Sequence, residues 1–129
     1  MSTVLPPFAA GVLIIENGLI LAIERDDGRL GLPCGKIEPG ETPAQAAVRE
    51  CREETGCEVR LLDYIRPPYV GLDVVDQNMV SLHRARILKR GRPTTPGEGS
   101  PVWVTSGRLL TATYADYNLA AFKHFEVRF

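Results

Sequence analysis

The local sequence that decides the fold of this chain is residues 35–57, GKIEPGETPAQAAVRECREETGC. Its second half has the features of one helix with both ends marked. Thr42 suits the helix cap, Pro43 suits the first helical position, and Gln45 can complete a capping box with Thr42. Gly56 supplies the residue at which many helices end. We therefore predict a loop, a helix between Thr42 and Gly56, and a second loop.

The predicted helix carries an apolar stripe on one side and a ridge of carboxylates on another. Positions i, i+3, i+4, i+7 and i+11 lie on one buried helical face. The residues with this spacing are Ala44, Ala47, Val48, Cys51 and Thr55. At about 100° per residue, Glu50, Glu53 and Glu54 fall within an arc of about 100°. We expect these three side chains to share one partly exposed ridge.

Neighbouring carboxylates repel one another unless a positive charge offsets them. Two unit charges about 4 Å apart repel by about 4 kcal/mol at an effective dielectric constant near 20. A divalent cation or a salt bridge removes this repulsion, and oxygen ligands favour Mg²⁺, with Mn²⁺ as a substitute, over zinc. Arg49 can reach Glu53, or Glu41 in the preceding loop, and is expected to orient the ligands without binding metal. The alternative is an ordinary solvated helix face.

Length and composition favour one globular domain over residues 1–129. Of these residues, 44% are hydrophobic and 24% are charged, with a formal net charge of −1. About two thirds of the unfolded surface can be buried at this length. The nearly neutral charge gives no general attraction to nucleic acid or to an anionic membrane. Neither a membrane span nor a signal peptide is evident, so a cytoplasmic location is the expectation.

The three cysteines are expected to be free thiols. Cys34, Cys51 and Cys57 are odd in number and lie within apolar patterns, which argues against a disulfide framework. No cysteine pair or nearby histidine completes a zinc site. A packed, unreactive Cys34 is favoured over a reactive thiol near the site.

Strands are expected on both sides of the helix. Phe8–Glu16 and Leu19–Arg25 are apolar runs joined by Asn17-Gly18, the dipeptide typical of a tight hairpin turn. Leu30–Gly35 is expected to be a short, irregular extended segment. The sequence therefore predicts a hairpin that leads, through a turn, into residues 35–57.

The second half of the chain shows fewer local signals. Glu58–Arg66 and Met79–Leu88 are predicted strands, separated by a turn region with Pro67, Pro68 and Gly71. Residues 91–101 are expected to form a mobile loop, and residues 102–104 a short strand with Trp103 in the core. Asp116–Phe125 is a predicted closing helix, with Leu119, Phe122 and Phe125 on one side.

Residues 35–57 resemble the Nudix box of the Nudix hydrolase family. The residues at the motif positions are Gly35, Glu41, Arg49, Glu50, Glu53, Glu54 and Gly56. The segment from Leu32 to Thr42 is similar to the family's usual Leu-Pro-Gly-Gly entry, and Trp103 to a strand that many members carry. Two residues depart from the family pattern, since Leu30 stands where many members have Trp and Cys34 where they have Gly.

The resemblance implies an α/β fold, a Nudix-type α/β/α sandwich with a mixed sheet and a loop-helix-loop box. It also implies that water attacks a phosphorus of a nucleoside diphosphate linked to another group. Glu50, Glu53 and Glu54, with the Gly35 carbonyl, would hold Mg²⁺, and either Glu50 or Glu53 would accept the water proton. Glu98 is a candidate for the extra carboxylate that some members recruit from a late loop.

The sequence indicates the substrate less clearly than it indicates the reaction. A nucleoside triphosphate pyrophosphohydrolase of the housecleaning kind is favoured. The alternatives are a nucleotide-sugar, ADP-ribose or dinucleoside polyphosphate hydrolase and a module that senses nucleotides without turnover. Removal of RNA caps is less favoured, because no RNA-binding appendage is evident. A nucleotide-like small molecule is the expected partner, and pairing of two copies is an expectation from the family alone.

Two groups of residues remain open as substrate contacts. The basic residues late in the Met79–Leu88 strand and beyond it either contact phosphates or end a strand in solvent. They are His83, Arg84, Arg86, Lys89, Arg90 and Arg92. Four aromatic residues either stack on a base or belong to the core. They are Tyr69, Tyr114, Tyr117 and Phe122.

Overall fold

The computed structural model describes residues 6–94 and 99–128. Within these residues the larger sheet has five strands, in the order β5-β1-β8-β6, with β7 also pairing with β8. The bounds are β1 Ala9–Leu13, β5 Cys34–Lys36, β6 Glu58–Leu61, β7 Tyr69–Asp73 and β8 Asn78–Lys89. β1 and β8 run parallel, and the other pairs run antiparallel. The predicted mixed sheet is therefore confirmed.

A smaller sheet and three helices complete the described fold. The strands of the smaller sheet are β2 Ile15–Glu16, β3 Leu19–Glu24, β4 Leu30–Gly31 and β9 Ser100–Val104. The other three strands all pair with β3. The helices are α1 Pro43–Thr55, α2 Ser106–Leu109 and α3 Ala115–His124. None of the helices in the described ranges is long and apolar enough to cross a membrane.

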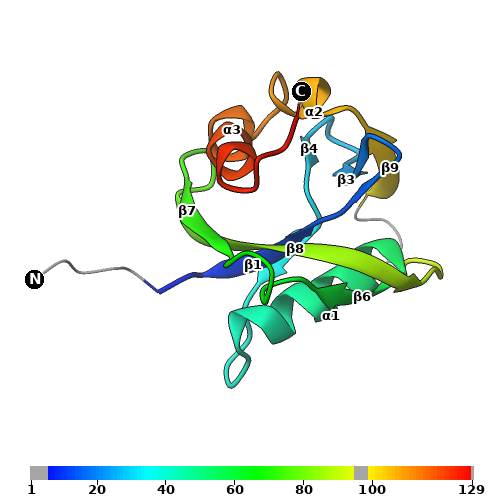
Figure 1. Cartoon of the computed structure of the whole chain (residues 1–129), viewed down its shortest axis with the longest axis vertical. Helices are drawn as coiled ribbons and strands as arrows, with labels where there is room; N and C mark the ends of the chain where they lie inside the picture. Colours follow the sequence, from blue (N-terminus) through cyan, green and yellow to red (C-terminus); the bar gives the residue numbers. More distant parts are fainter. Residues whose placement is uncertain (1–5, 95–98, 129) are drawn as a thin grey trace, which may run out of the picture.

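The larger sheet lies between two layers (Figure 1). On one face, Ala47 and Cys51 of α1 pack with Val12 of β1 in a buried cluster. On the other face lie α3 and the smaller sheet, where Phe122 of α3 packs in a second cluster that includes Leu82 of β8. The predicted α/β/α sandwich is confirmed, and β5 lies at one edge of the sheet that separates the two clusters.

The predicted hairpin turn is present, but the hairpin is shorter than expected. Asn17 and Gly18 both have positive φ, 51° and 77°, and the paired residues are those of β2 and β3. β1 instead joins the larger sheet, where it pairs with residues 80–84 of β8. All five residues of β1 are buried. The apolar run predicted as one strand thus contributes β1 to the larger sheet and β2 to the smaller sheet. Hydrophobic periodicity does not mark the residue at which the chain passes from one sheet to the other.

Two predicted features beside β8 are wrong. β6 ends at Leu61, and the expected strand does not continue through residues 62–66. Tyr69–Asp73, predicted as part of a turn region, is β7 and pairs with residues 78–82. The prolines at 67 and 68 precede β7 and so take no ladder position. The strand predicted at Met79–Leu88 is confirmed as β8.

The box helix forms as predicted, and its two ends are fixed by the expected side chains. The Gln45 N–H donates to Thr42 Oγ1 at 3.1 Å, and the Thr42 N–H donates to Gln45 Oε1 at 2.9 Å. Gly56 has a φ of 77° and donates its N–H to the Arg52 carbonyl. Local sequence therefore fixes where α1 begins and ends, and with it the positions of the carboxylates.

The C-terminal elements are present, with two errors in the predicted core. Trp103 is 37% exposed and lies under the guanidinium of Arg90, at 5.9 Å from the ring centroid, because the neighbouring Val104 takes the buried face of β9. Leu119 is also 37% exposed, whereas Phe122 and Phe125 are buried. The other buried residues of α3 are Tyr117, Asn118 and Ala121.

Candidate active site

Glu54 lies inside the protein, so the predicted exposed ridge of three carboxylates is wrong for this residue. Its residue exposure is only 8%. The backbone N–H of Cys34 donates to Glu54 Oε1 at 2.9 Å, and Arg25 Nη2 donates to Oε2 at 3.3 Å. Along the same helix Ala46 is buried, whereas Ala44 of the predicted stripe is only partly buried. The buried face of α1 is therefore rotated toward Glu54, which ties the helix to β5.

Glu50 and Glu53 belong to a network centred on Arg49. Arg49 Nη1 donates to Glu50 Oε1 at 2.7 Å and to Glu53 Oε2 at 3.2 Å. Its other nitrogens bind both oxygens of Glu41, at 2.7 and 3.0 Å, and the Lys36 carbonyl at 2.9 Å. The predicted contacts of Arg49 with Glu53 and Glu41 are thus present. One guanidinium offsets the repulsion between three carboxylates.

The Glu50 carboxylate lies directly against the backbone of Gly35. A Cβ atom built on Gly35 would overlap Cδ and both carboxylate oxygens of Glu50. The φ of Gly35 is not positive, so the close approach of this carboxylate, and not the backbone dihedral, requires glycine here. The Glu50 carboxylate therefore packs against Gly35, whose carbonyl is another of the predicted metal ligands.

The chemistry of these groups fits a hard divalent cation. The Gly35 carbonyl and the carboxylates of Glu50 and Glu53 are oxygen ligands of the kind that Mg²⁺ binds. Among the described residues, no three side chains of Asp, Glu, His or Cys are already gathered around a point that could hold an ion. Burial raises the pKa of Glu50 above its ordinary value, and the hydrogen bond from Arg49 opposes that shift.

The Arg49–Glu41 pair predicts a specific dependence of stability on pH. The hydrogen bonds from Arg49 lower the pKa of Glu41 from 4.5 to about 2. Because the folded pKa is below the unfolded one, the pair stabilises the protein above about pH 4.5, and this contribution is lost as the pH falls toward 2. Above pH 5 we expect the urea midpoint of unfolding of the wild type to exceed that of Glu41→Gln by a constant amount. This difference should shrink at lower pH, and a pH-independent difference would contradict the assignment.

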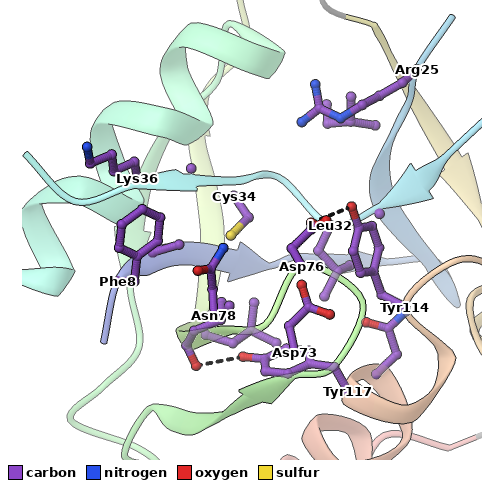
Figure 2. A pocket seen from close by; sticks show the side chains of 17 residues that line it. Phe8, Arg25, Leu32, Cys34, Lys36, Asp73, Asp76, Asn78, Tyr114 and Tyr117 are labelled. Carbon is purple, nitrogen blue, oxygen red and sulfur yellow. Dashed lines mark hydrogen bonds between the residues drawn. The ribbon is translucent and has the colours of Figure 1, made fainter. Parts of the chain in front are cut away.

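A cavity of ≈ 210 Å³ lies beside β5. Figure 2 shows that Cys34 and Lys36 line it from β5, while Asp73 and Asn78 face them from the opposite side. Its lining residues also include Phe8, Arg25, Gly35, Asp76, Tyr114 and Tyr117. Gly35 therefore borders the cavity with its backbone. It also borders the Glu50 carboxylate, which lies where a Cβ of Gly35 would be.

Several residues weighed in the sequence lie elsewhere. None of the six basic residues of the β8 region lines this cavity. His83, for example, is buried between Asp63 and Ser81, and Arg90 pairs with Glu16. Glu98 lies outside the described residues, so its role stays a prediction.

The cysteines behave as expected in the described residues. All three are free thiols. Burial is the main cause that raises the pKa of the Cys34 thiol to about 12, so Cys34 is mostly the unreactive thiol at neutral pH.

Several lining residues were not singled out from the sequence, among them Arg25, Lys36, Asp73, Asp76 and Asn78. Arg25, Asp73, Asp76 and Asn78 come from the end of β3 and from the β7–β8 hairpin. Arg25 comes two residues after the apolar run of residues 19–23, which is a weak signal for a residue at the end of a buried strand. The other three lie where a turn was predicted, and nothing in that segment marks a cavity wall.

Comparison with known proteins gives a family for this arrangement. The model of the NUDIX domain matches residues 5–124. An RNA pyrophosphohydrolase of Erythrobacter litoralis (strain HTCC2594) is 47% identical over 66 residues, which are 46% of this chain and 40% of that protein. A putative 8-oxo-dGTP diphosphatase 2 of Mycobacterium tuberculosis is 36% identical over 83 residues, 64% of this chain and 57% of that protein.

A solved structure, described as an Ap4A hydrolase binary complex from C. elegans, has the same fold. The TM-score is 0.70 at 20% identity, over 94% of this chain and 99% of that one. At this identity the likeness concerns the fold alone. The chain spans 40% and 57% of the lengths of the two curated relatives. The family model, in contrast, matches nearly the whole chain, and the chain therefore belongs to the NUDIX domain family.

Proposed function

We propose that this protein hydrolyses a diphosphate linkage in a nucleotide-like substrate with the help of Mg²⁺, and that nucleoside triphosphates, cut with release of pyrophosphate, are its substrates. Mn²⁺ is expected to substitute for Mg²⁺. The observation that carries the proposal is the position of Gly35, between the cavity and the Glu50 carboxylate. A nucleoside held in the cavity would extend its phosphates past Gly35 toward the carboxylates of α1.

Each group of the box has a distinct task in this proposal. Glu50, Glu53 and Glu54, with the Gly35 carbonyl, would hold the cation, which neutralises phosphate oxygens and lowers the pKa of the attacking water. Glu50 or Glu53 accepts the proton of that water. Arg49 acts through these carboxylates, because its guanidinium fixes the positions of both.

Arg25 and Lys36 are the lining residues suited to the phosphates. Both carry a positive charge at the cavity, and Lys36 directly follows Gly35. Cations near the scissile linkage stabilise the negative charge of the phosphate groups. Arg25 also binds Glu54 at 3.3 Å, so it joins the buried carboxylate to the wall of the cavity.

The experiment that tests this function is a substrate panel with separate measurement of pyrophosphate and phosphate. We expect pyrophosphate from nucleoside triphosphates in the presence of Mg²⁺, none in EDTA, and recovery when Mg²⁺ or Mn²⁺ is restored. Phosphate that forms from ADP-ribose, nucleotide sugars or dinucleoside polyphosphates only after a phosphatase is added would support the alternative hydrolases. Binding of nucleotides without any product would favour a sensing module.

The 5′ end of RNA is a second candidate substrate. It is favoured by the similarity to the RNA pyrophosphohydrolase of Erythrobacter litoralis, which covers 46% of this chain. The panel therefore includes a short 5′-triphosphorylated oligoribonucleotide beside the free triphosphate of its first nucleotide. A much higher kcat/KM for the oligonucleotide would replace free nucleotides with RNA as the substrate.

A further inference from the structure

Three arginines share one face of the larger sheet, where β6 pairs with the C-terminal part of β8. Val59 of β6 and Ala85 of β8 belong to the buried cluster on the α1 side. Successive side chains of a strand point to opposite faces of a sheet, so Arg60, Arg84 and Arg86 point away from α1. Arg60 and Arg86 are exposed, and Arg84 is partly buried. None of the three lines the cavity beside β5.

The ladder between β6 and β8 holds the three arginines close together. Arg60 and Arg86 are directly opposed partners, and such partners have Cβ atoms about 5 Å apart, with diagonal neighbours about 7–8 Å apart. The Leu62 N–H donates to the Arg84 carbonyl at 2.7 Å, which extends the pairing by one more step. Each guanidinium ends a flexible stem of three methylene groups. From these positions the three groups can converge on one ligand.

The positive charge of this arginine cluster, Arg60, Arg84 and Arg86, is not offset within the described residues. No carboxylate there forms an ion pair with any of the three. The acidic residues of the neighbouring segments face other groups. They are Asp63, which pairs with His83, Glu16, which pairs with Arg90, and Glu58, which is opposed to Lys89 in the ladder. Because like charges directly opposite one another destabilise a sheet, the cluster costs the fold free energy.

Arg84 distinguishes this cluster from a strand end that is merely solvated. Within residues 6–94 and 99–128, its Nε is the one buried side-chain nitrogen or oxygen that has no hydrogen-bond partner. Burial lowers the pKa of its guanidinium below the ordinary value, and no neighbouring acid counteracts this shift. A buried donor without an acceptor and a desolvated charge without a counter-charge both oppose folding. Packing alone therefore gives no reason for an arginine at this position.

We propose that Arg60, Arg84 and Arg86 bind a multiply charged phosphate anion at a site separate from the cavity. Arginine presents its N–H donors in a planar fork that matches pairs of phosphate oxygens. Three such groups suit a ligand with two or more phosphates, either a free oligophosphate or the backbone of a nucleic acid. Such a ligand would supply the counter-charge and the acceptors that the fold does not. The site does not depend on the hydrolysis proposed above.

The first test measures binding of inorganic pyrophosphate by calorimetry, in EDTA so that no divalent cation takes part. The proteins are wild type, Arg84→Met and Arg52→Met. Arg52 is exposed on α1, so its replacement removes the same charge on the other side of the sheet. Hydrogen bonds between charged groups correspond to roughly a 10- to 100-fold change in affinity. We expect Arg84→Met to bind at least about 10-fold more weakly than the other two. Equal affinities, or no binding to wild type, overturn the proposal.

A single-stranded oligoribonucleotide with a 5′-hydroxyl end distinguishes the two sources of phosphate. It has no terminal phosphates for the proposed reaction, so its binding reports on the backbone alone. Tighter binding than that of pyrophosphate, weakened in Arg84→Met, assigns the site to a nucleic-acid chain. Pyrophosphate binding that exceeds oligonucleotide binding, with the same loss in Arg84→Met, assigns it to a free oligophosphate.

Thermal melts of the same proteins separate a binding role of Arg84 from a structural one. In buffer without phosphate, methionine keeps an apolar stem and removes the unpaired charge, so the melting temperature of Arg84→Met should exceed that of wild type by about 3 °C or more. Pyrophosphate should raise the melting temperature of wild type and Arg52→Met more than that of Arg84→Met, because a ligand stabilises the fold that binds it. A lower melting temperature of Arg84→Met without anion would show that the arginine serves the fold, and would contradict the proposal.

Discussion

The Glu53→Gln variant is expected to lose about 100- to 10,000-fold in kcat, since a positioned acid or base contributes about that factor. Glu53 would lose its role whether it binds the cation or accepts the proton. Its side chain is 34% exposed and its Oε2 accepts a hydrogen bond from Arg49, which a glutamine oxygen can still do. The fold should therefore be retained. The measurement is steady-state release of pyrophosphate from a nucleoside triphosphate, beside a thermal melt of each protein.

Glu58→Gln is the matched control for this variant. Glu58 is exposed on β6, four residues after the end of the acidic cluster. The substitution removes one negative charge without touching α1 or the cavity. We expect kcat and the melting temperature of Glu58→Gln to stay close to those of wild type. A Glu53→Gln enzyme as active as this control would remove Glu53 from the catalytic assignment.

The Gly35→Ala variant is expected to lose about 100-fold or more in kcat with little change in stability. The added methyl group would overlap the Glu50 carboxylate. That carboxylate is the end of a flexible side chain and can move aside, so the fold can accommodate the change. The move separates Glu50 from the Gly35 backbone, and a displacement of about 1 Å at a catalytic group can cost about 100-fold in rate.

Gly107→Ala provides the control for a glycine replacement. Gly107 lies in α2, its φ is not positive, and the nearest atom to an added Cβ is Thr105 Oγ1 at 4.0 Å. Alanine should be accepted there, with activity unchanged. Equal activities of Gly35→Ala and Gly107→Ala would show that the contact between Gly35 and Glu50 has no part in the reaction.

The box helix could be predicted from sequence because its determinants are local. The cap, the first-turn proline and the final glycine of α1 all act within a few residues of where they stand. The same holds for the Asn17-Gly18 turn. The contact of Arg49 with Glu53 was also predictable, because it is an i, i+4 pair on one helix.

The burial of Glu54 could not be predicted in the same way. Helical periodicity assigns charged residues to the exposed face, and Glu54 is buried because two partners distant in sequence satisfy it. These partners are the Cys34 N–H and Arg25. A single sequence does not show which distant elements will contact one another. The pairing of β1 with β8 could therefore not be predicted either.

The cavity wall was missed because it depends on a strand that the prediction did not contain. Once Tyr69–Asp73 is a strand, its register with β8 places Asp73 opposite Asn78. Val70 and Leu72 gave only a weak strand signal, and the prolines before β7 favoured a turn instead. Both apolar side chains are exposed in the structure. Non-local pairing therefore assembled the wall of the cavity that Asp73 and Asn78 line.

The central claim is that the carboxylates of the box and Gly35 form a divalent-cation site, and Mn²⁺ binding followed by electron paramagnetic resonance tests it most directly. Free Mn²⁺ is measured during titration of wild type, Glu53→Gln and Glu58→Gln, first alone and then with excess Mg²⁺. We predict saturable binding to wild type and Glu58→Gln that Mg²⁺ displaces, and binding weakened at least about 10-fold in Glu53→Gln. Equal Mn²⁺ affinity in all three proteins, or no binding to wild type, would contradict the account.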